Sequence, residues 1–350
     1  MRIHTLHTLC ATIVALVCSI VAFPQRSQAQ EAYVHQSTDK ATLTFFYDTQ
    51  RSSRDGTTWG INDQKKEYDT MIPAWTHLIE GEDSEWNTLT TKAVFDASFQ
   101  DFRPTTTSYW FSGFKALQTI EGLENLNTSE VINMSYMFAD CPALTTLDLK
   151  NFNTEKVKDM NSMFTHCVAL TSLDLKNFNT EKVTDMSHLF SNCATLTALD
   201  LSRFNTAQVT DMSGMFKGCA ALTHCSLVSF NTEKVTDMRA MFSGCRALPR
   251  LDVDKFSLSA TTKVSEMFKD CAALQTLFSN KAWTCGESDG MFAGCLQLKG
   301  AVSFNDQQTT AAMANPTTGY FAKKMSEAYV VEDDNAGTLT FFYDANYDQY

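Results

Sequence analysis

The sequence lacks most of the signatures that would mark an enzyme. The H-E-x-x-H motif, the phosphate-binding P-loop and the dinucleotide-binding glycine fingerprint are all missing. The histidines beyond the first 30 residues are scattered, and no C-x-x-C pair is present to hold a metal ion. We therefore expect a non-enzymatic protein that uses no cofactor and no metal.

Clusters of basic residues are also missing. The chain has 28 Lys and Arg against 40 Asp and Glu, which gives a net charge of −12. Because neutralising phosphates needs clustered Lys and Arg, this balance argues against a nucleic-acid partner. No run of about 18 apolar residues follows the first 30 residues, so we expect no transmembrane span in the mature chain.

Residues 1–29 read as a secretory signal peptide. Arg2 precedes an apolar stretch over Ala11–Phe23, and Ser27-Gln28-Ala29 fits a small-x-small cleavage site. The alternative is a membrane anchor, but the stretch is short for a bilayer span. Cys18 follows Val17, where a lipid-attachment site usually has a small residue. We therefore expect export without lipidation.

A repeat of 26 residues dominates the rest of the chain. Its clearest column contains Cys141, Cys167, Cys193, Cys219, Cys245 and Cys271. A Phe stands three residues before each cysteine and a Leu three residues after it. The unit reads L-x-L-x-x-F-N-T-x-x-V-x-D-M-x-x-M-F-x-x-C-x-x-L, and related segments extend the array to about residues 90–300.

Each unit combines two hydrophobic periods. Residues 173–175 alternate apolar and polar side chains, as a half-buried strand does. Val183, Met186, Leu189 and Cys193 follow at a spacing that predicts a helix of two to three turns. One unit cannot close a core, so neighbours must stack. The sequence predicts an α/β repeat solenoid, leucine-rich-repeat-like, with strand-plus-short-helix units of about 26 residues.

The cysteine column has two interpretations. In an exported protein, evenly spaced cysteines form disulfides or bind metal. The alternative, which we favour, is a buried column of small apolar thiols, because the spacing equals the structural period. Cys285 and Cys295 are the pair we expect to be bonded if any disulfide forms.

Polar columns accompany the apolar ones. The asparagines are Asn127, Asn153, Asn179, Asn205 and Asn231. We expect them to satisfy backbone groups in a tight turn, with sugar or metal binding as the alternative. A pre-helix column contains Asp159, Asp185, Asp211 and Asp237, which we expect to act as caps. Stacked carboxylates can also bind calcium, and that alternative stays open.

The solvent-facing side of the strands is the candidate binding surface. Its members alternate with buried leucines, so they should point to solvent. The candidate ligand-facing residues are Asp148, Lys150, Asp174, Lys176, Asp200, Ser202, Asp252 and Asp254.

The flanks of the array break its period. Residues 30–89 should form a β-rich N-terminal cap containing a strand at Thr42–Asp48, and residues 301–326 a C-terminal cap. Thr338–Asp344 repeats Thr42–Asp48 in all seven places. We therefore expect residues 327–350 to begin a second, incomplete module of a longer protein. Alternatively, the final strand pairs back onto the first module.

The segment LDLSRFNTAQVTDMSGMFKGCAALT (Leu199–Thr223) resembles the repeats of BspA-like leucine-rich-repeat surface proteins. The segments T-L-T-F-F-Y-D, Y-W-F-S-G-F and N-P-T-T-G-Y-F are similar to members from Bacteroidetes. The resemblance implies a solenoid on the bacterial cell surface, exterior to the outer membrane. It also implies partners such as host matrix proteins or other bacteria. It carries over no catalytic or binding residue.

Three functions fit these patterns. The first is an adhesin or interaction scaffold that binds proteins through the strand surface, with glycans as a second class of partner. The second is a structural spacer in a multi-module protein. The third is a carbohydrate-binding accessory module that uses the cap aromatics Trp59, Trp75 and Trp86.

Overall fold

The computed structural model describes residues 29–67, 69–76, 87–324, 327–333 and 338–344. The predicted signal peptide lies outside the described residues except for residue 29, and the domain boundaries predicted above stay predictions. Within the described ranges the secondary structure consists of strands and short 3-10 helices, with no α-helix. No helix in this part of the chain is long and apolar enough to cross a membrane.

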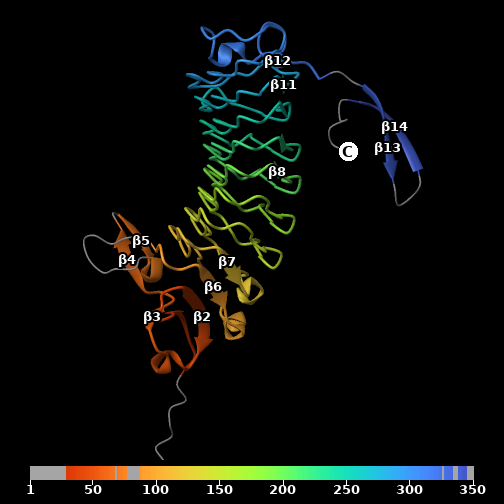
Figure 1. The fold of residues 1–350 in the computed structure, drawn as a ribbon. Helices are drawn as coiled ribbons and strands as arrows, with labels where there is room; N and C mark the ends of the chain where they lie inside the picture. The colour runs from red at the N-terminus through yellow and green to blue at the C-terminus, as the bar shows by residue number, and fades with distance from the viewer. Residues whose placement is uncertain (1–28, 68, 77–86, 325–326, 334–337, 345–350) are drawn as a thin grey trace, which may run out of the picture.

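A five-stranded sheet begins the molecule (Figure 1). Its strands are β1 (Glu31–Gln36), β2 (Thr42–Asp48), β3 (Thr57–Gly60), β6 (Lys92–Phe95) and β7 (Thr119–Glu121), in the order β3-β1-β2-β6-β7. The pairings of β1 with β2 and β3 are antiparallel, whereas β2–β6 and β6–β7 are parallel. The sheet therefore changes from hairpin pairing to the parallel pairing of the repeats. The strand predicted at Thr42–Asp48 is confirmed.

Smaller elements surround this sheet. β4 (Gln64–Glu67) and β5 (Thr70–Pro73) form an antiparallel pair. The 3-10 helices are η1 (Arg51–Ser53), η2 (Ala74–Thr76), η3 (Ala97–Asp101) and η4 (Leu123–Asn125).

An aromatic cluster joins the sheet to the first coil. Phe45 stacks on Phe95 and Trp110 with ring centroids 4.4 and 5.5 Å apart, and meets Trp75 edge-on at 5.9 Å. All four rings are buried. The indole N–H of Trp75 donates to the carbonyl of Trp110 over 2.9 Å. These large side chains cover the first open repeat, which would otherwise expose its apolar columns to water.

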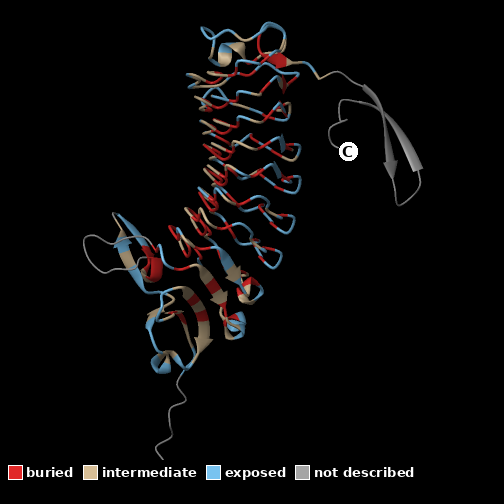
Figure 2. Cartoon of the chain, in the orientation of Figure 1, coloured by how far each residue is buried: buried red, intermediate tan, exposed pale blue. Residues whose placement is uncertain are grey.

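Successive repeats lie above one another (Figure 1). Parallel bridges join residues 26 positions apart, from Asn133↔Asp159 through Asp211↔Asp237. The rings of Phe138, Phe164 and Phe190 stack in turn, each 5.8 Å from the next. Figure 2 shows that buried residues recur at the same places in each coil. The apolar columns of the sequence are therefore the core, and neighbouring coils bury each other.

The short helix predicted in each unit is wrong, because the structure has consecutive turns there. His188 and Asn192 have φ of 55° and 58°, and Gly214 and Gly218 have 59° and 71°. A helix needs negative φ at every residue. The N–H of His188 donates to the carbonyl of Ser213 in the next coil, over 2.8 Å, rather than to its own coil. The three- and four-residue apolar spacing fits this coiled turn as well as a helix.

Short strands form the opposite side of the coils. They are β8 (Ala198–Leu199), β9 (His224–Cys225), β10 (Arg250–Asp252) and β11 (Thr276–Phe278). β8 pairs with β9 and β10 with β11, both in parallel and both in the 26-residue register. In the two preceding repeats the corresponding residues, 145–149 and 171–175, form no strand.

A column of buried threonines links the coils at a third position. The hydroxyl of Thr180 donates to the carbonyl of Asn205 over 3.0 Å and accepts the N–H of Asn205 over 2.8 Å. The same pair of bonds recurs in the neighbouring coils. The column contains Thr128, Thr154, Thr180, Thr206 and Thr232, each 1% exposed. Each hydroxyl therefore satisfies two backbone groups that the turn leaves unpaired.

The last coil is covered by aromatic residues. β12 (Phe321–Ala322) pairs in parallel with β11, and η5 (Ala311–Met313) lies nearby in sequence. Tyr320 meets Phe292 edge-on at 5.3 Å, and Phe321 meets Trp283 edge-on at 4.8 Å. Both ends of the stack are thus closed by aromatic rings.

A hairpin follows this end. β13 (Glu327–Asp333) and β14 (Thr338–Asp344) pair antiparallel. Their register, Glu327↔Asp344, matches Glu31↔Asp48 in β1 and β2. Among the described residues, the final strand therefore pairs with β13, and the domain assignment of residues 327–350 stays a prediction.

Candidate ligand-binding face

The strand face consists of the outward residues on the strand side of the coils, at positions 146, 148 and 150 and their equivalents in later repeats. Six of the eight predicted residues are exposed there, namely Asp148, Lys150, Asp174, Lys176, Asp200 and Ser202. Asp252 and Asp254 are half-buried. The structure thus gives the eight predicted residues two different environments, and their role as a ligand-facing surface stays a prediction.

The exposed carboxylates of this face are engaged in local turns. Asp148, Asp174 and Asp200 each accept the N–H two residues ahead, over 3.1–3.2 Å. Lys150 also pairs with Asp148 over 2.7 Å, and this hydrogen bond lowers the pKa of the Asp148 carboxyl. These side chains shape the exit of each strand, as Asx turns do. The observed partners favour structural over calcium-binding roles for this column.

The other two polar columns do the same at the remaining corners of the coil. Asn179 accepts the N–H of Glu181 over 3.0 Å, and Asp185 accepts that of Ser187 over 2.8 Å. The turn role expected for the asparagines is confirmed. Asp185 accepts a backbone N–H two residues ahead, as the predicted cap would. The prediction that it caps a helix is wrong, because the segment that follows it is a turn. Burial raises the pKa of Asp159 in this column.

The cysteine column is buried, and its thiols are unpaired. All nine cysteines of the described residues are free, including Cys285 and Cys295. The thiol of Cys193 donates to the carbonyl of Phe164 in the preceding coil over 3.1 Å, and its neighbours repeat this bond. Burial raises the pKa of the Cys167 and Cys219 thiols to about 12. The buried-thiol interpretation is confirmed.

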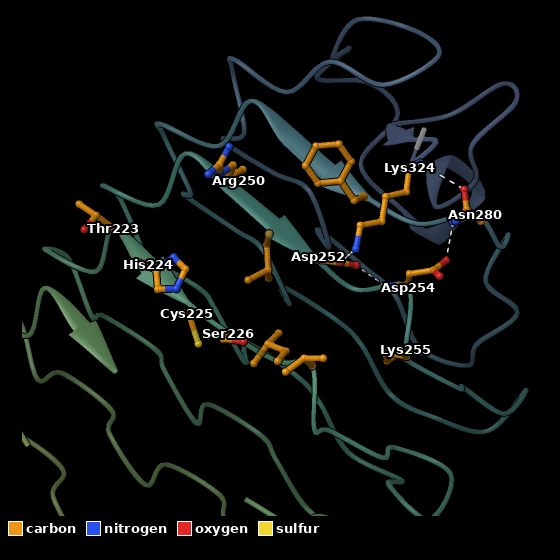
Figure 3. Close-up of a pocket in the computed structure, with 14 residues that line it drawn as sticks. Thr223, His224, Cys225, Ser226, Arg250, Asp252, Asp254, Lys255, Asn280 and Lys324 are labelled. Atoms are coloured by element: carbon orange, nitrogen blue, oxygen red, sulfur yellow. Dashed lines mark hydrogen bonds and ion pairs between the residues drawn. The ribbon is translucent and has the colours of Figure 1, made fainter. Parts of the chain in front are cut away.

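A hollow of about 160 Å³ interrupts the strand face near its C-terminal end (Figure 3). It lies between β9 and β10 and reaches toward the segment after β12. The lining residues are Thr223, His224, Cys225, Ser226, Leu227, Val228, Arg250, Leu251, Asp252, Asp254, Lys255, Phe278, Asn280 and Lys324. Of the eight predicted residues, only Asp252 and Asp254 line it.

The hollow exists because one coil departs from the repeat. Cys225 stands in the column of Leu199 and Leu251, and Ser226 stands in the column of Asp200 and Asp252. Both replacements are smaller than the residue they replace. Side-chain volume is therefore missing at the last residue of β9 and at the residue that follows it.

Charged groups line one wall of the hollow (Figure 3). Lys324 Nζ lies 2.7 Å from Asp252 Oδ2, and the Lys324 side chain is only 13% exposed. Asp254 Oδ1 accepts the backbone N–H of Asn280 over 2.6 Å. Asn280 Oδ1 in turn accepts the backbone N–H of Lys324 over 3.1 Å. Three chain segments thus meet in one hydrogen-bonded group.

Sequence reasoning missed Lys324, Asn280 and Phe278. Lys324 lies outside the repeat, so periodicity could not place it against Asp252. A usable signal was present for Phe278, which replaces the aspartate of its column.

The two described cap tryptophans differ in exposure. Trp75 is fully buried in the aromatic cluster, and Trp59 is half-buried. Trp86 lies outside the described residues.

One pentapeptide, Gly286-Glu287-Ser288-Asp289-Gly290, matches the G-x-S-x-G pattern of hydrolases. That motif acts on a sharp turn between a strand and a helix. Here the carbonyls of Glu287 and Asp289 accept N–H groups of the preceding coil, so the segment is one more repeat turn. Ser288 therefore has the wrong surroundings for a nucleophile.

Comparison with protein families identifies the array. A family model described as "Mycoplasma protein of unknown function, DUF285" matches residues 105–222 and 194–305. The chain belongs to this family. The two matched ranges cover most of the stacked coils and the lining residues of the hollow except Lys324.

Other comparisons add little to the DUF285 assignment. No curated protein matches the chain. A crystal structure of a leucine-rich cell surface protein from Faecalibacterium prausnitzii matches with 16% sequence identity. The match covers 85% of this chain and 94% of that chain, with a TM-score of 0.29. A likeness at this score carries no argument about the present chain.

Proposed function

We propose that the chain is a leucine-rich-repeat-like solenoid of the BspA-like type, displayed on the bacterial surface as a non-catalytic binding scaffold. Its partners would be proteins of a host matrix or of other bacteria, bound through the strand face. The leader sequence supports export, and the stacked coils support the solenoid. The proposal gives no residue a catalytic, cofactor-binding or metal-binding role.

One observation carries the proposal: the inward columns repeat, whereas the strand face varies. The column that begins at Thr146 continues with Ser172, Ala198, His224 and Arg250. All five side chains are exposed. Packing constrains the inward side chains, whereas the outward side chains of a solenoid can differ between repeats and so can be selected for contact with a ligand. A face that changes from coil to coil on a constant frame suits recognition of an extended partner.

Binding assays with charge-reversal variants test the proposal. The purified chain, without its predicted leader, is applied to immobilised matrix proteins and to whole bacteria. Lys150→Glu combined with Lys176→Glu changes the strand face. The matched control is Lys156→Glu combined with Lys182→Glu, exposed residues at another corner of the coils. We expect at least a tenfold loss of affinity for the first variant only. Equal loss in both, or no binding by the folded chain, would contradict the proposal.

A spacer role is the second candidate, and the hairpin favours it. β14 repeats the seven residues of β2, and β13–β14 repeats the register of β1–β2. Serial modules of this kind would hold a distal domain away from the cell. Folded chain that binds none of the surfaces above would direct attention to this role.

A further inference from the structure

We propose that the hollow on the strand face binds one neutral sugar residue of a glycan, packed on Phe278 and hydrogen-bonded by Asp254, Asn280 and Lys324. This site goes beyond the proposed function, because it would act whether or not the rest of the face binds a protein.

The size of the hollow limits its occupant. Pockets for whole small molecules or cofactors usually enclose roughly 300–1,000 Å³. A hollow of about 160 Å³ fits one ring-sized group that projects from a larger ligand. Its position on an open face, between β9 and β10, leaves room for the rest of a chain to continue over the neighbouring coils (Figure 3).

The charges on the wall favour a neutral ligand. Asp252 and Lys324 already neutralise each other at 2.7 Å. An anion would meet the carboxylates of Asp252 and Asp254, and a cation would meet the positive charges of Arg250, Lys255 and Lys324, which also line the hollow. A sugar hydroxyl both donates and accepts hydrogen bonds, so it fits a wall that offers both kinds of group at close range.

Two of the lining residues, Asp254 and Asn280, carry hydrogen-bonding atoms that are not used. Among the described residues, Asp254 Oδ2 and Asn280 Nδ2 have no hydrogen-bond partner, whereas Asp254 Oδ1 and Asn280 Oδ1 are engaged by backbone N–H groups. The engaged atoms hold each side chain in place. The free atoms therefore form a positioned acceptor and donor, beside the remaining N–H groups of Lys324.

Phe278 supplies the apolar platform. It stands in a column that otherwise contains Asp148, Asp174, Asp200, Ser226 and Asp252. Its side chain is half-buried on the strand face, and within the described residues it stacks on no other aromatic ring. The carbon–hydrogen face of a pyranose packs on the electron-rich face of such a ring.

A glycan array tests the inference. The array carries neutral glycans ending in glucose, galactose, mannose or N-acetylglucosamine, and acidic glycans that are sialylated or sulfated. We expect binding to at least one neutral series. Phe278→Ala and Asp254→Ala should each weaken it at least tenfold, whereas Phe278→Tyr should keep it.

A variant that restores the regular repeat sequence at the hollow, called the repaired repeat, tests the role of the hollow most directly. Cys225→Leu combined with Ser226→Asp restores the residues of the neighbouring coils, so it fills the hollow without disturbing the frame. We expect loss of glycan binding with an unchanged unfolding midpoint. Asp174→Ala combined with Lys176→Ala is the control on the same face, and it should bind as the parent chain does.

Three outcomes would overturn the inference: binding of acidic glycans only, binding that survives the repaired repeat, or no glycan bound. None of these outcomes decides the protein-binding proposal, which is read from the matrix and cell assays with the Lys150 and Lys176 variant. A chain that binds proteins but no glycan would lose the sugar site alone.

Discussion

The turn side and the strand side of the same coil differ in how they are joined to the next coil. On the turn side, Met186, His188 and Phe190 each donate an N–H to the following coil over 2.8–3.0 Å. On the strand side, β8 and β9 pair over only two residues. The turn side therefore sets the register of the stack. The strand side contributes less to holding the coils in register, so its side chains can change without loss of the fold.

Removing a ring from the core should have the largest effect. Phe190 is fully buried and stacks between Phe164 and Phe216, 5.8 Å from each. We expect Phe190→Ala to lower the free energy of unfolding by about 3–5 kcal/mol. Lys176→Ala, on the strand face of the same region, should change it by less than about 0.5 kcal/mol. Urea unfolding followed by circular dichroism measures both, and equal losses would show that the two sides are not distinct.

The threonine column should come next. Thr180→Val keeps the shape of the side chain but leaves the N–H and carbonyl of Asn205 without their hydroxyl partner. We expect a loss of about 1–3 kcal/mol. The exposed Thr184 also bonds a carbonyl, that of Lys158 over 3.2 Å, yet water can replace it. Thr184→Val should therefore cost less than about 0.5 kcal/mol by the same measurement.

Alkaline pH should weaken the stack through the cysteine column. Burial raises the pKa of the Cys167 and Cys219 thiols from 9.0 to about 12. A raised folded-state pKa means that the folded chain holds its protons longer than the unfolded chain. This contribution to stability is present below pH 9 and is lost as the pH rises toward 12. Melting temperature recorded from pH 7 to 11 should fall more steeply for the parent chain than for Cys219→Ala.

Thiol labelling should distinguish the cysteine column from Cys285, which lies in the array but outside that column. Cys285 is half-buried, whereas the other eight cysteines of the described residues are buried. An aromatic disulfide reagent at neutral pH should modify Cys285 first and the column only after denaturant is added. Rapid labelling of several cysteines in the folded chain would contradict the packing described here.

The parts that repeat were predictable from sequence, and the parts made by single departures were not. Stacking of the Phe and Cys columns follows from the 26-residue spacing alone. The turn conformation did not follow, because alternating left-handed residues such as His188 and Asn192 leave the apolar spacing unchanged. In the sequence, the only sign of the hollow is that Cys225 and Ser226 replace the Leu and Asp of the neighbouring repeats. Its charged wall depends on Lys324, which comes from outside the period.

The left-handed positions also explain which residues the turn accepts. His188, Asn192 and Gly218 occupy them, and Asn and Gly are the residues that adopt this conformation most easily. A Cβ at Gly244 would lie 3.5 Å from the backbone of Gly218, an ordinary contact, so its φ of 77° favours glycine but space does not exclude a residue such as the Asn192 of the same column.

Each coil donates its turn-side N–H groups to the next coil, so equivalent sets of hydrogen bonds recur every 26 residues along the stack. We therefore expect the coils to detach one after another when the chain is pulled from one end. A force applied to one end breaks one set of bonds at a time, and each 26-residue coil releases roughly 90 Å of extended chain before the next is loaded. Stretching should therefore absorb energy in many small steps.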